Sequence, residues 1–149
     1  MSNSGFTSKP KYIICDYAAS RNGKSGTALK VMDILSGIKS PLTQVTHGKN
    51  INSDRYEEYD FNGVKITVFS QGDPGPKSYQ LPDLKAAVAS GADVIICASR
   101  SSGDTVNNIY KIAKNYEKIW YRNFYADNWT QQFGDFLNEN YRFLLVLLR

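Results

Sequence analysis

The stretch that sets the fold reads KYIICDYAASRNGKSG and covers Lys11–Gly26. Its first part, Lys11–Tyr17, is a short apolar run with β-branched residues at its centre. Such a run is typical of a buried strand and is too short for a helix. A small, polar, glycine-containing segment follows. From about Ser25, apolar residues recur near the 3.6-residue helical period, and we expect a helix that is closed by Gly37 and Pro41.

Strand and helix signals alternate along the rest of the chain. Asn62-Gly63 is a favoured two-residue turn and predicts a hairpin between its flanking strands. The polar stretch Thr43–Arg55 is poor in apolar residues and predicts a long loop. The other expected strands are Tyr56–Phe61, Val64–Phe69, Asp93–Ala98 and Glu117–Tyr121, and the other expected helices are Leu81–Ala89, Asp104–Tyr116 and Gln131–Leu148.

The two central strands, Lys11–Tyr17 and Asp93–Ala98, are apolar without a two-residue alternation. That pattern is typical of a parallel sheet that helices cover on both faces. We therefore predict an α/β fold, a three-layer sandwich with a mostly parallel central sheet. Residues 1–10 are mostly small and polar and predict a flexible lead-in, and residues 11–149 are expected to form one domain.

The composition is that of an ordinary globular protein. The chain has 149 residues, of which 42% are hydrophobic and 21% charged, and its net charge is +4 at pH 7. This mild basic excess suits a protein that handles phosphates, and it permits contact with DNA without requiring it. The longest uncharged apolar run, Phe143–Leu148, is too short for a membrane span, and the N-terminus lacks the apolar stretch of a secretory signal. We therefore expect a cytoplasmic protein.

Cysteine and histidine are scarce in this chain. Cys15 and Cys97 both lie inside apolar runs and are expected to be small buried thiols, not a disulfide or half of a zinc site. The single histidine, His47, excludes a multi-histidine metal centre. Because His47 lies in a polar stretch, we expect its side chain to be solvated.

The sharpest chemical signal is Gly23-Lys24-Ser25, between the first strand and the first helix. A phosphate-binding loop needs backbone N–H groups at a helix N-terminus, a lysine for the β- and γ-phosphates, and a hydroxyl for Mg²⁺. Lys24 and Ser25 are these residue types in the right order, although Ala18 stands where the motif has a glycine. The alternative is a Gly-Lys-Ser tripeptide that occurs by chance.

We predict that this segment binds ATP, with Lys24 as a catalytic residue and Ser25 as a ligand of Mg²⁺. The predicted nucleotide-binding residues of the loop are Ala19, Ser20, Arg21, Asn22, Gly23, Lys24, Ser25 and Gly26.

A second glycine-containing turn, Ser70–Gly75, follows the predicted strand Val64–Phe69. An aspartate just beyond the carboxyl end of a strand beside a phosphate loop can hold Mg²⁺, directly or through water. We therefore expect Asp73 to bind the metal and to take part in catalysis. The alternative is a plain turn, because Asp-Pro-Gly is a favoured turn sequence.

A third candidate region follows the predicted strand Asp93–Ala98. Ligands of open α/β sheets bind beyond the carboxyl ends of the strands. Arg100 lies there and is expected to meet a phosphate or the base of the nucleotide. Asp104, a few residues later, can equally be the cap of the following helix.

The order of these pieces resembles the ParA/MinD group within the SIMIBI class of P-loop NTPases, in particular divergent members found on plasmids and phages. The corresponding segments are Ala18–Ser25, Gly72–Pro76 and Ala92–Asp104, and the resemblance covers about residues 11 to 125. It implies an ATP-binding switch that hydrolyses ATP slowly and changes partners with its nucleotide state. A role in plasmid or DNA partition, stability or transfer is implied as well, with a protein partner or a homodimer.

Two departures from that group concern its active site. The group's signature lysine would fall at Ala19, and the proline after the late strand is replaced by Ala98-Ser99. Arg21 lies in the same loop and could substitute for the lysine. Phosphoryl transfer relies on cations gathered around the transferred group. We therefore predict slow or absent hydrolysis unless a partner supplies the missing charge.

Two other functions stay open at this point. A small nucleotide kinase would use the same loop, but it usually has an arginine-rich lid, and this chain has no closely spaced arginine pair. A module with a degenerate loop would not hydrolyse nucleotide and would act through DNA or a protein partner. The chain has no Asn-Lys-x-Asp guanine-reading motif, which favours ATP over GTP.

Basic and aromatic residues interleave in Tyr116–Trp129, with Lys114, Lys118 and Arg122 among or beside them. Such a pattern can stack on bases and bind a nucleic-acid backbone. A surface for a protein partner, or ordinary core aromatics, would explain it equally well.

Overall fold

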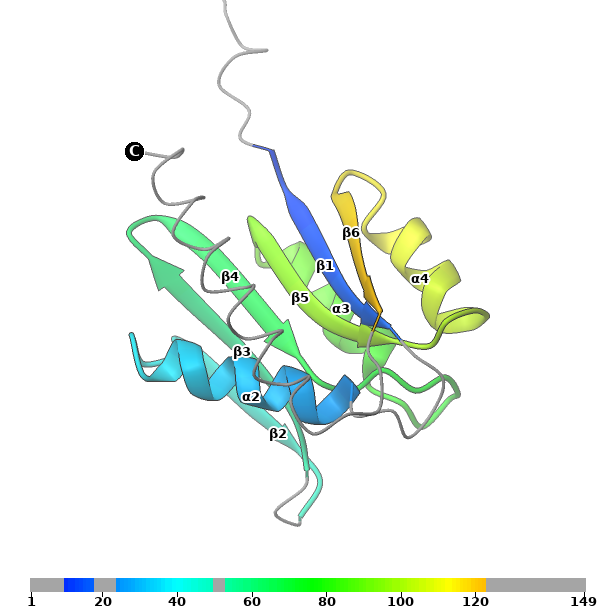
Figure 1. Ribbon diagram of the computed structural model, residues 1–149, viewed down its shortest axis with the longest axis horizontal. Coiled ribbons are helices and arrows are strands. Elements are labelled where there is room, and N and C mark those ends of the chain that lie inside the picture. The colour runs from blue at the N-terminus through cyan, green and yellow to red at the C-terminus, as the bar shows by residue number, and fades with distance from the viewer. Residues whose placement is uncertain (1–9, 18–23, 50–52, 123–149) are drawn as a thin grey trace, which may run out of the picture.

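The computed structural model describes residues 10–17, 24–49 and 53–122. Within these residues the chain forms a six-stranded sheet flanked by helices (Figure 1). The strands are β1 (Tyr12–Tyr17), β2 (Thr43–His47), β3 (Asp54–Phe61), β4 (Val64–Phe69), β5 (Val94–Ser99) and β6 (Glu117–Arg122), and the helices are α2 (Lys24–Ser36), α3 (Gln80–Ala89) and α4 (Asp104–Ile112).

The strands lie in the order β2-β3-β4-β5-β1-β6. The strands β4, β5, β1 and β6 are parallel to one another, whereas β3 runs antiparallel to both β2 and β4. Cys15, near the centre of β1, is paired in register with Cys97 of β5 and Trp120 of β6. The predicted α/β class is confirmed, and the sheet is mixed because an antiparallel pair adjoins its parallel part.

Helices cover both faces of the sheet (Figure 1). Successive side chains of a strand point to opposite faces. In β1, Ile14 packs with α2, whereas Ile13 and Cys15 pack with α3 and α4. In β5, Ile96 belongs to the core on the α2 side and Ile95 to the core on the other side. Because both faces of β1 and β5 are buried, their sequences are apolar without alternation.

The strands β3 and β4 form the predicted hairpin. Asn62 has a φ of 56° and Gly63 a φ of 90°. These are left-handed conformations, which asparagine and glycine adopt most easily and which this two-residue turn requires. The hairpin brings the carboxyl end of β4 to the same edge of the sheet as the carboxyl ends of β5 and β1.

The predicted loop over Thr43–Arg55 is wrong at both ends, because Thr43–His47 forms β2 and Asp54 begins β3. The described strands pair β2 with β3 alone, and most side chains of β2 are exposed. A strand with no buried face needs no apolar residues, so a polar sequence can form it without any periodic signal.

The helix α4 ends at Ile112 and not at Tyr116, where the sequence pattern placed its end. The N–H of Ala113 still donates to the carbonyl of Ile109. Beyond it, Lys118 Nζ donates to the carbonyls of Ala113 and Tyr116 at 2.9 Å each. This places a cation at the carboxyl end of α4, where the helix dipole favours positive charge.

Several predictions concern parts of the chain outside the described residues, among them the end of the basic and aromatic stretch Tyr116–Trp129, after Arg122. The flexible lead-in, apart from Pro10, and the helix Gln131–Leu148 also lie there. Among the helices that the structure does describe, none is long and apolar enough to cross a membrane.

Candidate functional site

The strands β1 and β5 lie side by side and end together, with Tyr17 paired in register to Ser99. After β1 the chain leads to α2 on one face of the sheet, whereas after β5 it leads to α4 on the other face. In open α/β sheets, ligands bind in the crevice where neighbouring strands send their connections to opposite faces. The candidate site therefore lies beyond the carboxyl ends of β1 and β5.

The predicted phosphate loop joins β1 to α2 at this crevice. Most of it lies outside the described residues, namely Ala19, Ser20, Arg21, Asn22 and Gly23. The structure places the backbone of Lys24, Ser25 and Gly26 in the first turn of α2 and leaves the side chains of Lys24 and Ser25 undescribed. The motif thus stands between a buried strand and a helix, which is the context that it requires.

The first turn of α2 has the character of an anion site. The N-terminus of a helix carries a partial positive charge and backbone N–H groups without partners in the helix, and both attract phosphate. No acidic residue stands in this turn. Gly26 is exposed, and a Cβ added there would meet no atom within 4 Å. The backbone of the turn is therefore accessible at Gly26.

A buried carboxylate near the end of β1 escaped the sequence reasoning. Asp16 is fully buried and is paired in register with Ala98 of β5 and Tyr121 of β6. Burial raises the pKa of the Tyr121 phenol, and the nearby charge of Asp16 raises it further. The sequence did contain a signal for this buried carboxylate, since Asp16 is the one acidic residue in the apolar run Tyr12–Tyr17.

Asp73 and Arg100, which the sequence singled out separately, form an ion pair. The Nε and Nη2 atoms of Arg100 each lie 3.1 Å from Asp73 Oδ1. The side chain of Asp73 is 53% exposed and that of Arg100 is 34% exposed. The predicted metal ligand and the predicted phosphate ligand therefore contact each other at the surface of the protein.

The strand order corrects the expectation that the strand before Asp73 lies beside the phosphate loop. The strand β5 lies between β4 and β1. Because neighbouring strands are about 4.8 Å apart, the ends of β4 and β1 are separated by about 10 Å. Arg100 follows β5, so its backbone lies one strand nearer to the loop than that of Asp73. Strand order depends on long-range pairing, which a local sequence pattern does not encode.

The segment after β4 passes close to β5 at Gly72. A Cβ added to Gly72 would lie 2.8 Å from the carbonyl carbon of Ala98 and 2.9 Å from its Cβ. The plain turn that the sequence offered as an alternative is present as well. Gly75 has a φ of 114°, and its carbonyl accepts a hydrogen bond from the N–H of Ser78. The same segment thus forms a turn and brings Asp73 to Arg100.

A pocket of about 270 Å³ adjoins this ion pair, between the β4–α3 connection and α4. Asp73 and Asp104 line it, together with the amides of Gln80 and Asn108. The Gln80 amide is fixed, because its Nε2 donates to the carbonyl of Thr105 at 3.2 Å and its Oε1 accepts from Asn108 Nδ2 at 3.0 Å. These polar groups suit a small molecule that carries hydroxyl or amino groups.

Asp104 is not the cap of α4. The N-cap residue is Gly103, with a φ of 88°, and it makes no side-chain cap bond. The following residue has a different role, since Thr105 Oγ1 accepts a hydrogen bond from the N–H of Arg100 at 3.0 Å and lies 3.2 Å from Ser99 Oγ. These bonds hold the backbone of Arg100 at the crevice.

The prediction of a solvated His47 is wrong. Its Nε2 lies 3.0 and 3.1 Å from the two carboxylate oxygens of Asp83, and its ring stacks on Tyr79 with centroids 3.8 Å apart. Burial raises the pKa of Asp83, and the hydrogen bond to His47 opposes that rise. The contact joins the end of β2 to the start of α3.

The two cysteines are buried free thiols, as predicted. Their Sγ atoms lie 4.0 Å apart on neighbouring strands. The hydrogen bond to Cys15 and burial both raise the pKa of Cys97. The cysteines are therefore small core side chains of β1 and β5.

No protein-family model matches the chain, and no curated protein matches it significantly. Within residues 10–17, 24–49 and 53–122, no group of three or more His, Cys, Asp or Glu side chains gathers in a way that could hold a metal ion. A functional proposal for this chain therefore rests on the geometry of the crevice.

Proposed function

We propose that the chain binds ATP with Mg²⁺ at the crevice between β1 and β5 and acts as a nucleotide-dependent switch. One observation carries this proposal: Gly23-Lys24-Ser25 stands where the buried strand β1 gives way to α2, at the point where the connections of the sheet diverge. The helix N-terminus offers N–H donors, Lys24 a cation for the phosphates and Ser25 a hydroxyl for Mg²⁺. In this proposal the fold is that of a P-loop NTPase similar to the ParA/MinD group, in a cytoplasmic protein of plasmid or DNA partition, stability or transfer.

Arg100 is the second cation of the proposed site. Its backbone is held by Thr105 beside the end of β1, and its guanidinium group is partly exposed. Asp73 lies one strand further away and is paired with Arg100. We therefore assign Asp73 the positioning of Arg100 and a contact with Mg²⁺ through water, which Mg²⁺ retains readily in proteins.

Hydrolysis by the isolated chain is slow or absent in this proposal. Ala19 supplies no charge where the resembled group has a lysine, and Arg100 is already held by Asp73. Loss of one cation at the transferred group commonly lowers the rate about 10³-fold or more. A steady ATPase rate above about 1 s⁻¹ for the isolated chain, abolished in Lys24→Ala, would contradict this part of the proposal.

The pocket next to Asp73 favours one other candidate, a small kinase whose phosphate acceptor occupies it. Its carboxylates and fixed amides could bind the acceptor hydroxyl group. Consumption of ATP that rises on addition of nucleosides or nucleoside monophosphates, and no longer does so in Asn108→Ala, would favour the kinase over the switch.

Titration of the full chain with ATP and GTP, with and without Mg²⁺, tests the proposed function. We expect ATP to bind more tightly with Mg²⁺ than without it. Lys24→Ala should weaken binding by about a hundredfold, since a bond to a charged phosphate is worth about 1.5–3 kcal/mol. Lys30→Ala is the matched control, because Lys30 is an exposed lysine further along the same helix. Equal affinities in these two variants would overturn the proposed site.

The metal is tested by Ser25→Ala and Asp73→Asn. Ser25→Ala should bind ATP with little dependence on Mg²⁺, whereas Asp73→Asn should keep part of that dependence, because its contact is made through water. Binding by the wild-type chain that is indifferent to Mg²⁺ would remove the metal from the proposal.

A further inference from the structure

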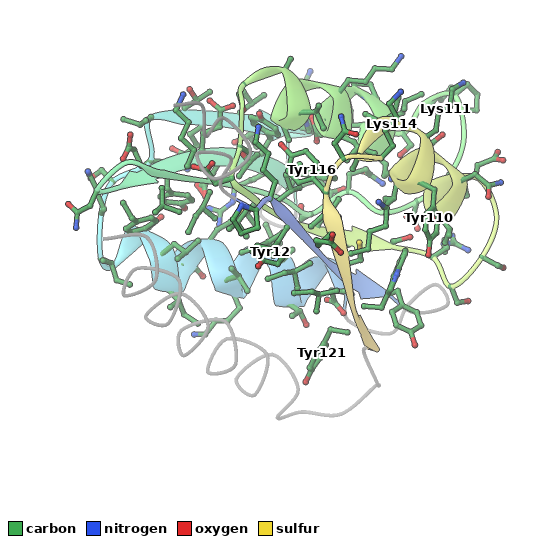
Figure 2. The ribbon with its side chains drawn as sticks, turned by 90° about the horizontal axis from the view of Figure 1, so that it is seen from above. Tyr12, Tyr110, Lys111, Lys114, Tyr116 and Tyr121 are labelled. Atoms are coloured by element: carbon green, nitrogen blue, oxygen red, sulfur yellow. The ribbon has the colours of Figure 1, made fainter. Side chains whose placement is uncertain are left out.

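The outward face of α4 is basic and aromatic. Tyr110 is 53% exposed, and Lys111 and Lys114 are exposed beside it. Figure 2 shows these three residues together at one end of the molecule. No acidic residue occurs from Thr105 to Tyr116. We call this region the α4 surface and define it by Asn107, Tyr110, Lys111 and Lys114, with Lys118 and Trp120 of β6 beside them.

Aromatic rings continue from this surface towards the end of β1. The Tyr110 and Trp120 ring centroids are 5.9 Å apart, and the Trp120 and Tyr17 centroids are 5.8 Å apart. Lys118 Nζ lies 5.4 Å from the centroid of the Tyr110 ring. Because Lys118 also donates to two carbonyls at the end of α4, its position is fixed. The ring of Tyr110 is thus held in place while the residue stays exposed.

Among the described residues, the carboxylates of Glu117 and Asp104, the closest in sequence to α4 and β6, lie away from this surface. In β6, Trp120 packs on the α3 and α4 side of the sheet and Tyr121 on the α2 side. Since side chains alternate along a strand, Glu117 lies on the α2 side, and Lys118 lies on the same side as Trp120. Asp104 stands at the opposite end of α4, about 10 Å along the helix from Lys111. The described side chains of this surface therefore carry a net positive charge.

We propose that the α4 surface binds single-stranded nucleic acid. A fixed, exposed tyrosine offers a platform on which an unpaired base can stack, and flanking lysines neutralise the phosphates on either side. Tyr110 is the stacking residue, and Lys111 and Lys114 are the phosphate contacts. In a duplex the base faces are stacked on one another, so a duplex would contact the lysines but not the ring of Tyr110. This binding is independent of the proposed nucleotide site, since it uses none of that site's residues.

The test is fluorescence anisotropy of the full chain with a labelled single-stranded DNA of mixed sequence, about 16 nucleotides long. Salt is varied from about 50 to 200 mM, because a single-strand contact contributes about 0.7 to the slope of log affinity against log salt. We expect binding that weakens with salt, and an unlabelled duplex of the same sequence should compete more weakly than the unlabelled single strand.

Two sets of variants separate stacking from charge. Tyr110→Ala should weaken binding about tenfold with the salt slope unchanged, because a lost stack removes no phosphate contact. Lys111→Gln/Lys114→Gln should weaken binding and lower the slope of log affinity against log salt by about 1.4, because two phosphate contacts of about 0.7 each are lost. Lys30→Gln/Lys39→Gln changes the net charge equally at two exposed lysines in and after α2. This control should bind as the wild type does.

Three results would overturn the proposal. The first is no binding of the single strand at about 50 mM salt. The second is an equal loss of affinity in Lys111→Gln/Lys114→Gln and in the control Lys30→Gln/Lys39→Gln. The third is a Tyr110→Ala variant that binds as the wild type does. The first would favour a protein partner for this surface. ATP titration of Lys111→Gln/Lys114→Gln and DNA binding by Lys24→Ala keep the two proposals apart, since each variant should lose one activity and retain the other.

Discussion

At the scale of single residues, the lack of a side chain at Gly72 lets the β4–α3 connection lie against β5. A Cβ there would come within 2.9 Å of the carbonyl carbon, the oxygen and the Cβ of Ala98. The backbone that follows carries Asp73 to Arg100. One residue thus sets how closely the two predicted ligands approach each other.

We expect Gly72→Ala to destabilise the fold by about 1–3 kcal/mol, the usual effect of atoms added to a packed site. Urea denaturation measures this loss. Gly26→Ala is the control, because an added Cβ meets nothing at Gly26 and alanine is favoured within a helix by about 0.5–1 kcal/mol. A Gly72→Ala chain as stable as the wild type would show that the segment shifts without strain.

At the scale of secondary-structure elements, the sequence predicted the strands and helices whose burial leaves a local pattern of apolar residues. The strands β1 and β5 are apolar because both of their faces are buried, and the β3–β4 hairpin follows from Asn62-Gly63. The strand β2 was missed because its exposed side chains carry no pattern. The contact of His47 with Asp83 was missed because it joins residues 36 positions apart.

In the candidate site, too, the sequence predicted the local features but not the contacts between distant segments. The Gly-Lys-Ser motif and the start of α2 are local features, and the sequence predicted the helix to begin within one residue of its first residue, Lys24. The pairing of Asp73 with Arg100 depends on the position of β5 between β4 and β1. Strand order follows from packing across the whole chain, so no single segment predicts it.

The His47–Asp83 contact should stabilise the junction of β2 and α3. His47→Ala leaves a buried carboxylate without its imidazole partner, and we expect a loss of about 2–3 kcal/mol near pH 7. Without His47 the raised pKa of Asp83 rises further, because the hydrogen bond and the electrostatic effect of His47, which lower this pKa, are gone. A group whose pKa is raised by folding loses its stabilising effect as pH rises through the folded value.

The defect of His47→Ala should therefore shrink as the pH falls through the raised pKa of Asp83, and it should be smallest below about pH 4, where Asp83 is protonated in both folded and unfolded chains. Thermal melts of wild type and variant across this pH range measure the difference. Asp83→Asn in the His47→Ala background should restore part of the stability near neutral pH, because it removes the buried charge. A defect that does not depend on pH would contradict this account.

At the scale of the whole molecule, the two proposed binding sites lie in different parts of the fold. The crevice lies beyond the carboxyl ends of β1 and β5, whereas the α4 surface lies on the face of the sheet that α3 and α4 cover (Figure 1). The row from Tyr110 through Trp120 to Tyr17 connects the two regions.

The buried tyrosines should set the alkaline limit of the fold. Burial raises the pKa values of Tyr56 and Tyr59, and the Tyr59 hydroxyl donates to Glu57 at 2.9 Å and lies 3.2 Å from the carbonyl oxygen of Met32. Phenols of this kind stabilise the fold below their unfolded pKa of about 10, and the effect is lost as pH rises through the folded value. The part of the phenolate absorbance that comes from the buried tyrosines should appear together with the loss of circular dichroism, in one transition above about pH 10. Tyr59→Phe should make stability less steeply dependent on pH.

The measurement that tests the central claim most directly is the amide NMR spectrum of the labelled full chain during titration with Mg²⁺ and ATP. Phosphate held by the N-terminus of α2 must shift the backbone N–H signals of Gly23, Lys24 and Gly26, because those groups would donate to it. The signals of Gly63 and Gly91, in turns at the opposite edge of the sheet, should stay unchanged. Shifts confined to other parts of the chain, or no shifts with ATP in excess, would contradict the account.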